Sequence, residues 1–188
     1  MLKPIEEFAK HIAITGFKNV KIKDVEEFLE KINREKPANV EVQFFDAELV
    51  ATWQHLYFAV LNALTAFKNK QNISKALAIE IMLYASAQRQ IRKAMELIGI
   101  KPNSSKIVVI AVGEDPKTVE TALSIVSKHV EAERDENILE VTDAKAKKIQ
   151  EAFEISDLEI ETVAKEGDLK RALVDLVIER MVLLSVQH

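Results

Sequence analysis

The chain has 188 residues, of which 48% are hydrophobic and 30% are charged, so we expect one domain spanning residues 1–188 with a sizeable core. The formal net charge of −4 excludes a protein that coats nucleic acid through overall basicity, although it is compatible with a local basic patch. Because the chain contains no cysteine, disulfide frameworks, thiolate metal ligands and cysteine nucleophiles are excluded, and a reducing environment is expected.

The N-terminal quarter predicts two strands joined by a helix. The stretch KHIAITGFKNV is typical of a strand that ends at Gly16, and DVEEFLEKINRE has the apolar spacing of a helix with Asp24 as its cap. Apolar and polar residues then alternate from Val40 to Phe44, which indicates a second strand with one buried face.

Two long helices are predicted next. Asp46 is expected to cap the first, over residues 47–69, and Ser74 is expected to cap the second, over residues 75–99. The short apolar run KIVVIAV, residues 106–112, is rich in β-branched side chains and predicts a strand that is covered on both faces.

The C-terminal part is predicted to be mostly helical. A helix capped by Asp115 is followed by NILEV, a weaker fourth strand, and helices over residues 143–153 and 168–187 flank a helical turn around Leu158. Strands and helices mix without strict alternation. We therefore expect an α/β protein of the α+β kind, with a small mixed or antiparallel sheet of about four strands covered by helices.

The sequence offers no recognisable catalytic site. Its four glycines form no phosphate-binding loop, and its four histidines lack the spacing of a metal-binding pair or a catalytic triad. His55 lies in an apolar stretch, where a hydrogen-bonded core histidine is more frequent than a catalytic one. The N-terminus lacks a secretory signal, and the longest apolar run is far short of the roughly 20 residues that span a membrane. We expect a cytoplasmic, non-enzymatic protein with no cofactor and no metal.

The stretch LYASAQRQIRKAM, residues 83–95, changes from apolar to small and then to amide and basic side chains. On one continuous helix, Gln88 and Arg92 lie one turn apart, as do Arg89 and Lys93. Glutamine amides suit base edges and ribose hydroxyls, and arginine binds phosphate, so this edge is compatible with RNA contact. The alternative is a solvated helix face whose arginines cover neighbouring apolar surface.

The segment FFDAELVATWQHLYFAVLNALTAFKNKQNISKALAIEIMLYASAQRQI resembles the small kinase-binding subunit of the KEOPS complex, the family that includes the human protein TPRKB and its archaeal relatives. The match is most specific in HLYFAVLNAL, NIS and YASAQRQI, and the order of the flanking elements agrees over nearly the whole chain. The resemblance implies a non-catalytic, archaeal-type regulatory subunit that binds the KEOPS kinase/ATPase subunit. It also implies that the protein docks the single-stranded CCA end of tRNA, which the complex modifies with threonylcarbamoyl at the adenosine next to the anticodon.

The candidate RNA-binding residues combine the NIS and ASAQRQ positions of this resemblance with neighbouring basic side chains. They are Asn72, Ser74, Lys75, Gln88, Arg89 and Arg92. Two other interpretations stay open. One is a regulator that switches the partner kinase without binding RNA, and the other is a small enzyme that uses His55 or paired acidic residues.

The C-terminal helix has apolar residues over more of its circumference than a surface helix needs. One apolar stripe is expected to pack inward and another to bind the kinase subunit, with Lys170, Arg171 and Arg180 at the rim of the interface. The candidate partner-binding residues are Val174, Val177, Ile178 and Met181. The alternative is a helix wholly enclosed by the chain's own core.

Overall fold

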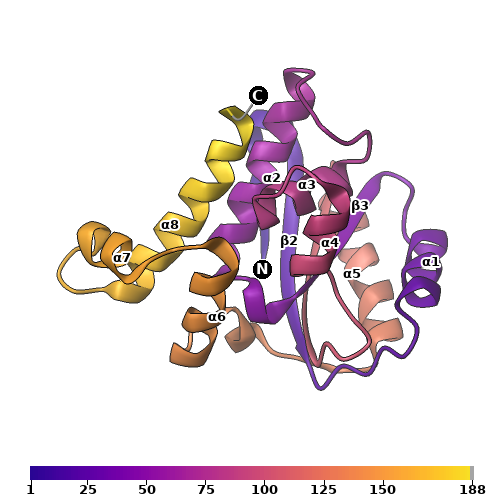
Figure 1. Cartoon of the computed structure of the whole chain (residues 1–188). Coiled ribbons are helices and arrows are strands. Elements are labelled where there is room, and N and C mark those ends of the chain that lie inside the picture. The colour runs from indigo at the N-terminus through magenta and orange to yellow at the C-terminus, as the bar shows by residue number, and fades with distance from the viewer. Residues whose placement is uncertain (187–188) are drawn as a thin grey trace. The chain divides into compact units, whose positions relative to one another are not determined.

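The computed structural model describes residues 1–186. Within them lie eight α-helices and one five-stranded antiparallel sheet (Figure 1), which confirms the predicted α+β fold class. The contacts within the chain define two compact units. The sheet unit comprises Met1–Ala47 and Gly99–Ile138, and the helical unit comprises Glu48–Ile98 and Leu139–His188. The single domain over residues 1–188 stays a prediction.

The sheet unit contains five strands: β1 (Leu2–Ile5), β2 (Lys10–Lys18), β3 (Val40–Asp46), β4 (Lys106–Gly113) and β5 (Glu133–Arg134). Their order is β1-β2-β4-β3, with β5 paired to β2, and every neighbouring pair is antiparallel. Since β2 and β3 both run antiparallel to β4, which lies between them, they are parallel to each other. β4 is buried from Ile107 to Gly113, and this burial explains its unbroken apolar sequence.

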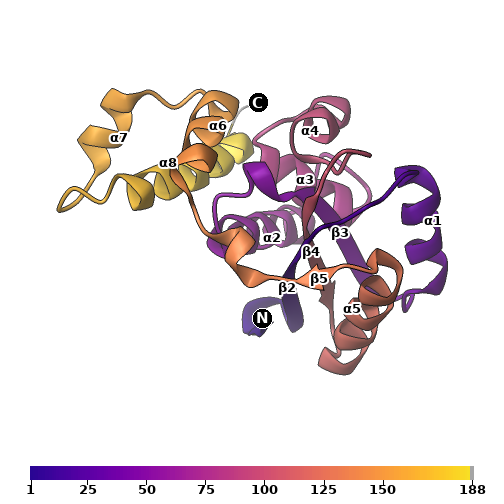
Figure 2. The ribbon, with the colours of Figure 1, turned by 90° about the horizontal axis from the view of Figure 1, so that it is seen from below.

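Two helices pack on one face of this sheet, α1 (Val25–Glu35) and α5 (Pro116–Val130). Asp24 begins α1 by accepting the amide N–H of Glu27 at 2.9 Å, and Asp115 begins α5 in a similar way, so both predicted caps are confirmed. α5 packs across β2, β3 and β4, and α1 packs against α5 (Figure 2). In the core between helices and sheet, the rings of Phe28 and Phe44 meet edge to face with centroids 5.1 Å apart.

β3 lies at an edge of the sheet, and nearby groups bond its outward backbone atoms. The Val40 N–H donates to the carbonyl oxygen of Pro37 at 3.1 Å, and the Lys36 ammonium donates to the carbonyl oxygen of Val40 at 2.5 Å. Four residues after Val40 on the same strand, the Phe44 N–H donates to the side-chain oxygen of Gln43 at 2.8 Å. Positions 40 and 44 point to the same edge because backbone groups alternate along a strand.

Gly16 allows the segment after α5 to cross closely over β2. The Asp135 N–H donates to the carbonyl oxygen of Gly16 at 3.0 Å. A Cβ at Gly16 would lie 2.5 Å from the side chain of Ile138 and 2.6 Å from the carbonyl oxygen of Asp135. The predicted end of this strand at Gly16 is therefore wrong: β2 continues to Lys18, and the glycine serves a close approach inside the strand.

The helical unit contains six helices: α2 (Trp53–Lys68), α3 (Leu77–Ser86), α4 (Ile91–Ile98), α6 (Asp143–Phe153), α7 (Asp157–Val163) and α8 (Leu169–Leu183). α8 packs against α2, α3, α6 and α7, and α3 also packs against α2 and α4. Ile149 and Phe153 of α6 share a buried cluster with Leu173 and Val177 of α8. The predicted helices at 143–153 and 168–187 and the helical turn near Leu158 are thus present, although Gln187 lies outside the described residues.

Three sequence predictions for the connections are wrong. NILEV contributes to a 3₁₀ helix, η3 (Glu136–Leu139), rather than to a strand. Asp46 is the last residue of β3, and α2 begins only after Thr52, with a short 3₁₀ helix, η2 (Ala47–Leu49), between them. The predicted helix over 75–99 is two helices, because α3 starts after Ala76 and the chain leaves helical geometry at Ala87.

Replacing Gly16 by alanine is expected to lower the free energy of unfolding by about 1 to 3 kcal/mol, because the added methyl group overlaps Ile138 and a backbone carbonyl. Gly113→Ala is the comparison, since an added Cβ there would lie 3.0 and 3.1 Å from methyl groups of Val119 and Val40, a less severe overlap that should cost less stability. Urea unfolding followed by circular dichroism measures both variants. A Gly16→Ala variant as stable as the parent chain would contradict the close crossing.

Candidate functional site

The NIS motif lies in the loop between α2 and α3, and a buried carboxylate holds this loop. Glu80 of α3 is fully buried, and its oxygens accept the N–H of Ile73 at 3.0 and 3.1 Å and the N–H of Ser74 at 2.7 Å. Hydrogen bonds to an ionised group are among the stronger ones in proteins. Sequence analysis missed Glu80, although a single acidic residue within the apolar run LAIEIMLYAS is a detectable signal.

Two of the predicted RNA-binding side chains also stabilise this loop. The Asn72 side-chain amide donates to the carbonyl oxygen of Ser74 at 2.9 Å, and the Ser74 hydroxyl oxygen accepts the N–H of Ala76 at 3.2 Å. Ser74 is buried, so it shapes the loop and does not cap α3. The loop exposes Lys75 and Ile73 to solvent.

The ASAQRQ motif spans the end of α3 and a turn. Ala87 adopts left-handed backbone geometry, with φ 51° and ψ 35°, and its N–H donates to the carbonyl oxygen of Tyr84 at 2.9 Å. The Gln88 N–H donates to the carbonyl oxygen of Leu83 at 3.0 Å. These two bonds form a Schellman ending, and Gln88 to Gln90 therefore lie in a turn outside regular helix.

The two arginines near this turn have different surroundings. The Nη1 of Arg89 donates to the carbonyl oxygen of Leu184, just after α8, at 3.2 Å. Arg92 lies in the first turn of α4, its side chain is 89% exposed, and its Nε pairs with Glu96 at 2.8 Å within the same helix. Arg89 thus links two parts of the helical unit, whereas Arg92 projects into solvent.

The expected single RNA-binding edge is in fact two separate patches. Asn72, Ser74 and Lys75 precede α3, and Gln88, Arg89 and Arg92 follow it. Because α3 has ten residues, the two patches are about 15 Å apart along its axis. The one-turn spacing of Gln88 and Arg92 is also wrong, since these residues do not share a helix.

α8 buries part of the predicted partner-binding stripe. Val177 and Met181 are fully buried and Val174 is 9% exposed, whereas Ile178 is half-buried. The exposed apolar side chains of this region lie further along the chain, at the end of α8 and in the 3₁₀ helix η4 (Leu184–Val186). They are Val182, Leu183 and Val186.

A groove of about 580 Å³ lies between the start of α2 and the first half of α8. It includes the apolar side chains of Phe58, Val174 and Ile178, and Phe58 is 39% exposed. Val141 is a further apolar lining residue. The polar lining residues are Thr52, Gln54, Asp168, Lys170, Arg171 and Asp175. Val174 and Ile178 are therefore the two predicted partner-binding residues that the structure brings together at a surface.

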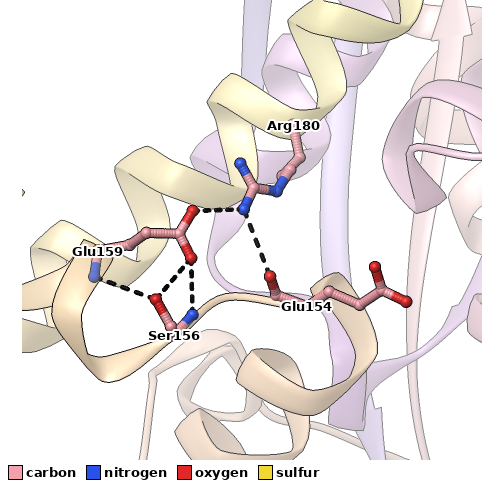
Figure 3. Close-up of polar contacts among 4 residues, drawn as sticks. All are labelled: Glu154, Ser156, Glu159 and Arg180. Carbon is pink, nitrogen blue, oxygen red and sulfur yellow. Dashed lines mark hydrogen bonds and ion pairs between the residues drawn. The ribbon is translucent and has the colours of Figure 1, made fainter.

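Arg180, which was predicted at the rim of the interface, instead binds α7 (Figure 3). Its Nη2 donates to Glu159 at 2.6 Å and to the carbonyl oxygen of Glu154 at 3.4 Å. Ser156 and Glu159 form a reciprocal capping box at the start of α7. The hydrogen bond from the Ser156 N–H and the contact with Arg180 lower the pKa of the Glu159 carboxyl to about 2, so this connection persists at neutral pH.

The other two predicted rim cations lie near the start of α8. Lys170 pairs with Asp143 of α6 at 2.9 Å, and Arg171 is exposed. Both line the groove described above. Their charges are balanced there by Asp168 and Asp175, so the groove is not a cationic surface.

His55 is fully buried, and backbone groups bind both of its ring nitrogens. Nδ1 accepts the N–H of Ala51 at 3.1 Å, which leaves the proton on Nε2 to be donated to the carbonyl oxygen of Ala85 at 2.7 Å. Burial lowers the pKa of His55 to about 4, and the bond to Ala85 offsets this only in part. The geometry matches a structural histidine that joins α2 to α3, since neither ring nitrogen faces a surface.

Among residues 1–186, no group of three or more His, Cys, Asp or Glu side chains is arranged to hold a metal ion. None of the helices in this described part of the chain combines the length and the apolar character of a membrane span.

Comparison with known proteins gives two matches. A family profile described as Kinase binding protein CGI-121 matches residues 17–185. A protein of Methanocaldococcus jannaschii, named Regulatory protein Cgi121, is 33% identical over 116 residues, which span 62% of this chain and 72% of that relative. The profile therefore covers nearly all of the helical unit and the sheet unit from residue 17 onward, without β1 and most of β2.

His55 is expected to make stability depend on pH between 6.5 and 4. Its pKa is about 4 in the folded chain against 6.5 in the unfolded chain, so its contribution is fully present above pH 6.5 and is lost as the pH falls towards 4. The loss amounts to about 3 kcal/mol, because each pKa unit corresponds to about 1.4 kcal/mol. Urea unfolding at several pH values should show a shallower decline for His55→Gln than for the parent chain or the His11→Gln control. Parallel curves for all three would contradict the buried neutral histidine.

Proposed function

This chain belongs to the CGI-121 family of kinase-binding proteins, and from that premise we propose that it is the non-catalytic KEOPS subunit that binds and regulates the kinase/ATPase subunit. We further propose that it docks the single-stranded CCA end of tRNA for threonylcarbamoyl modification of the adenosine next to the anticodon. The family match over residues 17–185 is the observation that carries the kinase part. A cytoplasmic location and an archaeal-type assembly are part of the proposal, in agreement with the archaeal relative and the absence of cysteine.

The proposed kinase-binding surface is the outward side of α8 together with the groove beside it. Ile178, Val182 and Val186 follow one another at intervals of four residues, which keeps them on one side of the helical segment. Val182 is 44% exposed and Val186 is 66% exposed, a large apolar exposure for the end of one helix. At the start of this stripe, Ile178 and Phe58 line the groove of about 580 Å³, which suits an apolar side chain of a partner.

Acidic side chains flank this surface. Asp175 and Glu179 are exposed on α8 on either side of Ile178. A partner surface with apolar residues at its centre and charged residues of both signs at its rim would complement this pattern, since Lys170 and Arg171 also line the groove. The proposed kinase-binding surface therefore contains Val182 and Val186 instead of the predicted Val177 and Met181, which are buried. It keeps Ile178 and, as part of the groove, Val174.

The proposed RNA-binding surface consists of the two patches at the ends of α3. The loop patch presents Lys75, and the turn patch presents Gln88, Arg89 and Arg92, with Lys93 beside them. An acidic chain needs such local cationic groups to hold a phosphate backbone. The separation of about 15 Å suits an extended single strand that contacts both patches better than a single nucleotide.

RNA binding by this surface is tested with the double charge reversal Lys75→Glu and Arg92→Glu, which changes one exposed cation in each patch. We expect at least about a tenfold loss of affinity for a single-stranded RNA that ends in CCA, measured by fluorescence anisotropy at fixed salt. Lys147→Glu with Lys165→Glu, two exposed lysines elsewhere in the helical unit, is the matched control and should bind like the parent chain. Undiminished binding by the Lys75 and Arg92 variant, or no binding by the parent chain, would favour the RNA-independent kinase regulator.

Kinase binding is tested with Val182→Arg combined with Val186→Arg. Two charged side chains in the centre of an apolar interface should weaken the affinity for the kinase subunit by at least about tenfold, while RNA affinity and unfolding midpoint stay unchanged. The control is Leu158→Arg with Val163→Arg, which makes the same change at two exposed apolar positions of α7. Isothermal titration with the purified kinase subunit measures all three chains. If the α8 variant binds as tightly as the control, the kinase contacts a different surface.

A further inference from the structure

A side chain from a different part of the helical unit holds the end of α8. The Nη1 of Arg89 donates a hydrogen bond to the carbonyl oxygen of Leu184 at 3.2 Å, across 95 positions of sequence. Leu184 is the residue at which α8 passes into the 3₁₀ helix η4. The last carbonyl groups of a helix lack partners within it and carry partial negative charge, so a guanidinium group is favoured there. Arg89 therefore stabilises the final turn of α8.

The final turn of α8 and the η4 segment that follows it display three exposed apolar side chains. Leu184 itself is buried, whereas Val182 and Leu183 before it and Val186 after it are 40% to 66% exposed. The carbonyl group that Arg89 binds thus lies within the segment that carries the proposed kinase-binding stripe. The order of this segment affects how well that stripe is presented to a partner.

The backbone of Arg89, at the other end of this hydrogen bond, is held by the turn that ends α3. Arg89 follows Ala87 and Gln88, whose N–H groups close the Schellman ending on Tyr84 and Leu83. Its side chain is therefore directed by a rigid turn, and the backbone of Arg89 lies within the turn patch proposed to contact RNA. One side chain belongs to both surfaces.

We infer that Arg89 is a positioning residue that couples RNA binding at the turn patch to kinase binding at the end of α8; this inference rests on the proposed function. A phosphate group next to the turn restricts the Arg89 guanidinium, whose planar fork can contact a carbonyl oxygen and a phosphate with different N–H groups. The end of α8 is then already ordered when the kinase subunit binds, so the entropy of ordering it is not lost again. RNA therefore raises the affinity for the kinase subunit, and by linkage the kinase subunit raises the affinity for RNA by the same factor.

The test measures the affinity of the whole chain for the purified kinase subunit without RNA and with a saturating single-stranded RNA that ends in CCA. We expect RNA to tighten kinase binding by about fivefold or more in the parent chain. This factor should fall to about one in Arg89→Ala, and Arg89→Lys should restore it in part, because an ammonium group can still donate to Leu184. Lys147→Ala is the control and should keep the full factor, since Lys147 is exposed and lies outside both proposed surfaces.

Hydrogen exchange of the free chain tests the contact itself. The amides of residues 182–186 should exchange about fivefold faster in Arg89→Ala than in the parent chain, and Arg92→Ala should leave them unchanged. Unchanged exchange in Arg89→Ala would overturn the role of Arg89 at the end of α8.

The outcomes separate the coupling from the proposed function. Arg89→Ala with an undiminished coupling factor, or a parent chain that binds both partners with a factor of one, overturns the coupling and leaves the proposed function intact. A parent chain that binds no RNA overturns the RNA part of the proposed function and the coupling with it. If Arg89→Ala lowers the affinities for RNA and for the kinase subunit but leaves the coupling factor unchanged, Arg89 has only a structural role and the coupling is overturned.

Discussion

The helical unit depends on polar side chains that satisfy backbone groups where its helices end. Buried N–H and C=O groups without partners are costly, and the breaks between α2, α3, α4 and α8 create many of them. Glu80 binds two N–H groups of the loop before α3, His55 binds Ala51 and Ala85 at either side, and Arg89 binds the last turn of α8. Each of these contacts fixes a loop, a turn or a helix end, and the loop before α3 and the turn after it carry the candidate RNA-binding residues.

This arrangement explains how the NIS segment and the segment from Gln88 to Gln90, which lie in a loop and a turn, are held in place. The NIS loop is shaped by a buried carboxylate, and the turn after α3 is shaped by left-handed Ala87. Exposed groups such as Lys75 and Arg92 then project from backbone that is already ordered, which reduces the entropy lost when a partner binds. The proposed RNA-binding surface therefore consists of exposed side chains on backbone that contacts within the chain hold in place.

The sequence predicted the features that depend on local chemistry. Asp24 and Asp115 cap their helices because a carboxylate before an apolar periodic segment satisfies the first N–H groups. The break at Ala87 was not predictable in this way, since neither glycine nor proline occurs between Ser74 and Ile98. β1 and β5 were missed because they have four and two residues, too few for a period to emerge.

The candidate site was predictable in composition but not in geometry. The residue types around Arg89 are compatible with RNA contact, and the family resemblance added Asn72 to the prediction. The separation of the two by α3 depends on where that helix begins and ends. The sequence also could not predict which side of α8 is buried, because apolar residues surround most of this helix. The packing of α2, α3, α6 and α7 against it decides this. Val177 and Met181 face the core for that tertiary reason.

The bonded edge of β3 limits the ways in which this chain can meet other proteins. An open edge strand is a template for a further strand, whether from a legitimate ligand or from a misfolded copy. Gln43, Lys36 and Pro37 bond the N–H and C=O of Val40 and the N–H of Phe44, so a strand that paired there would first have to break these bonds. At these positions the chain therefore disfavours pairing with a further strand, including one from another copy of itself.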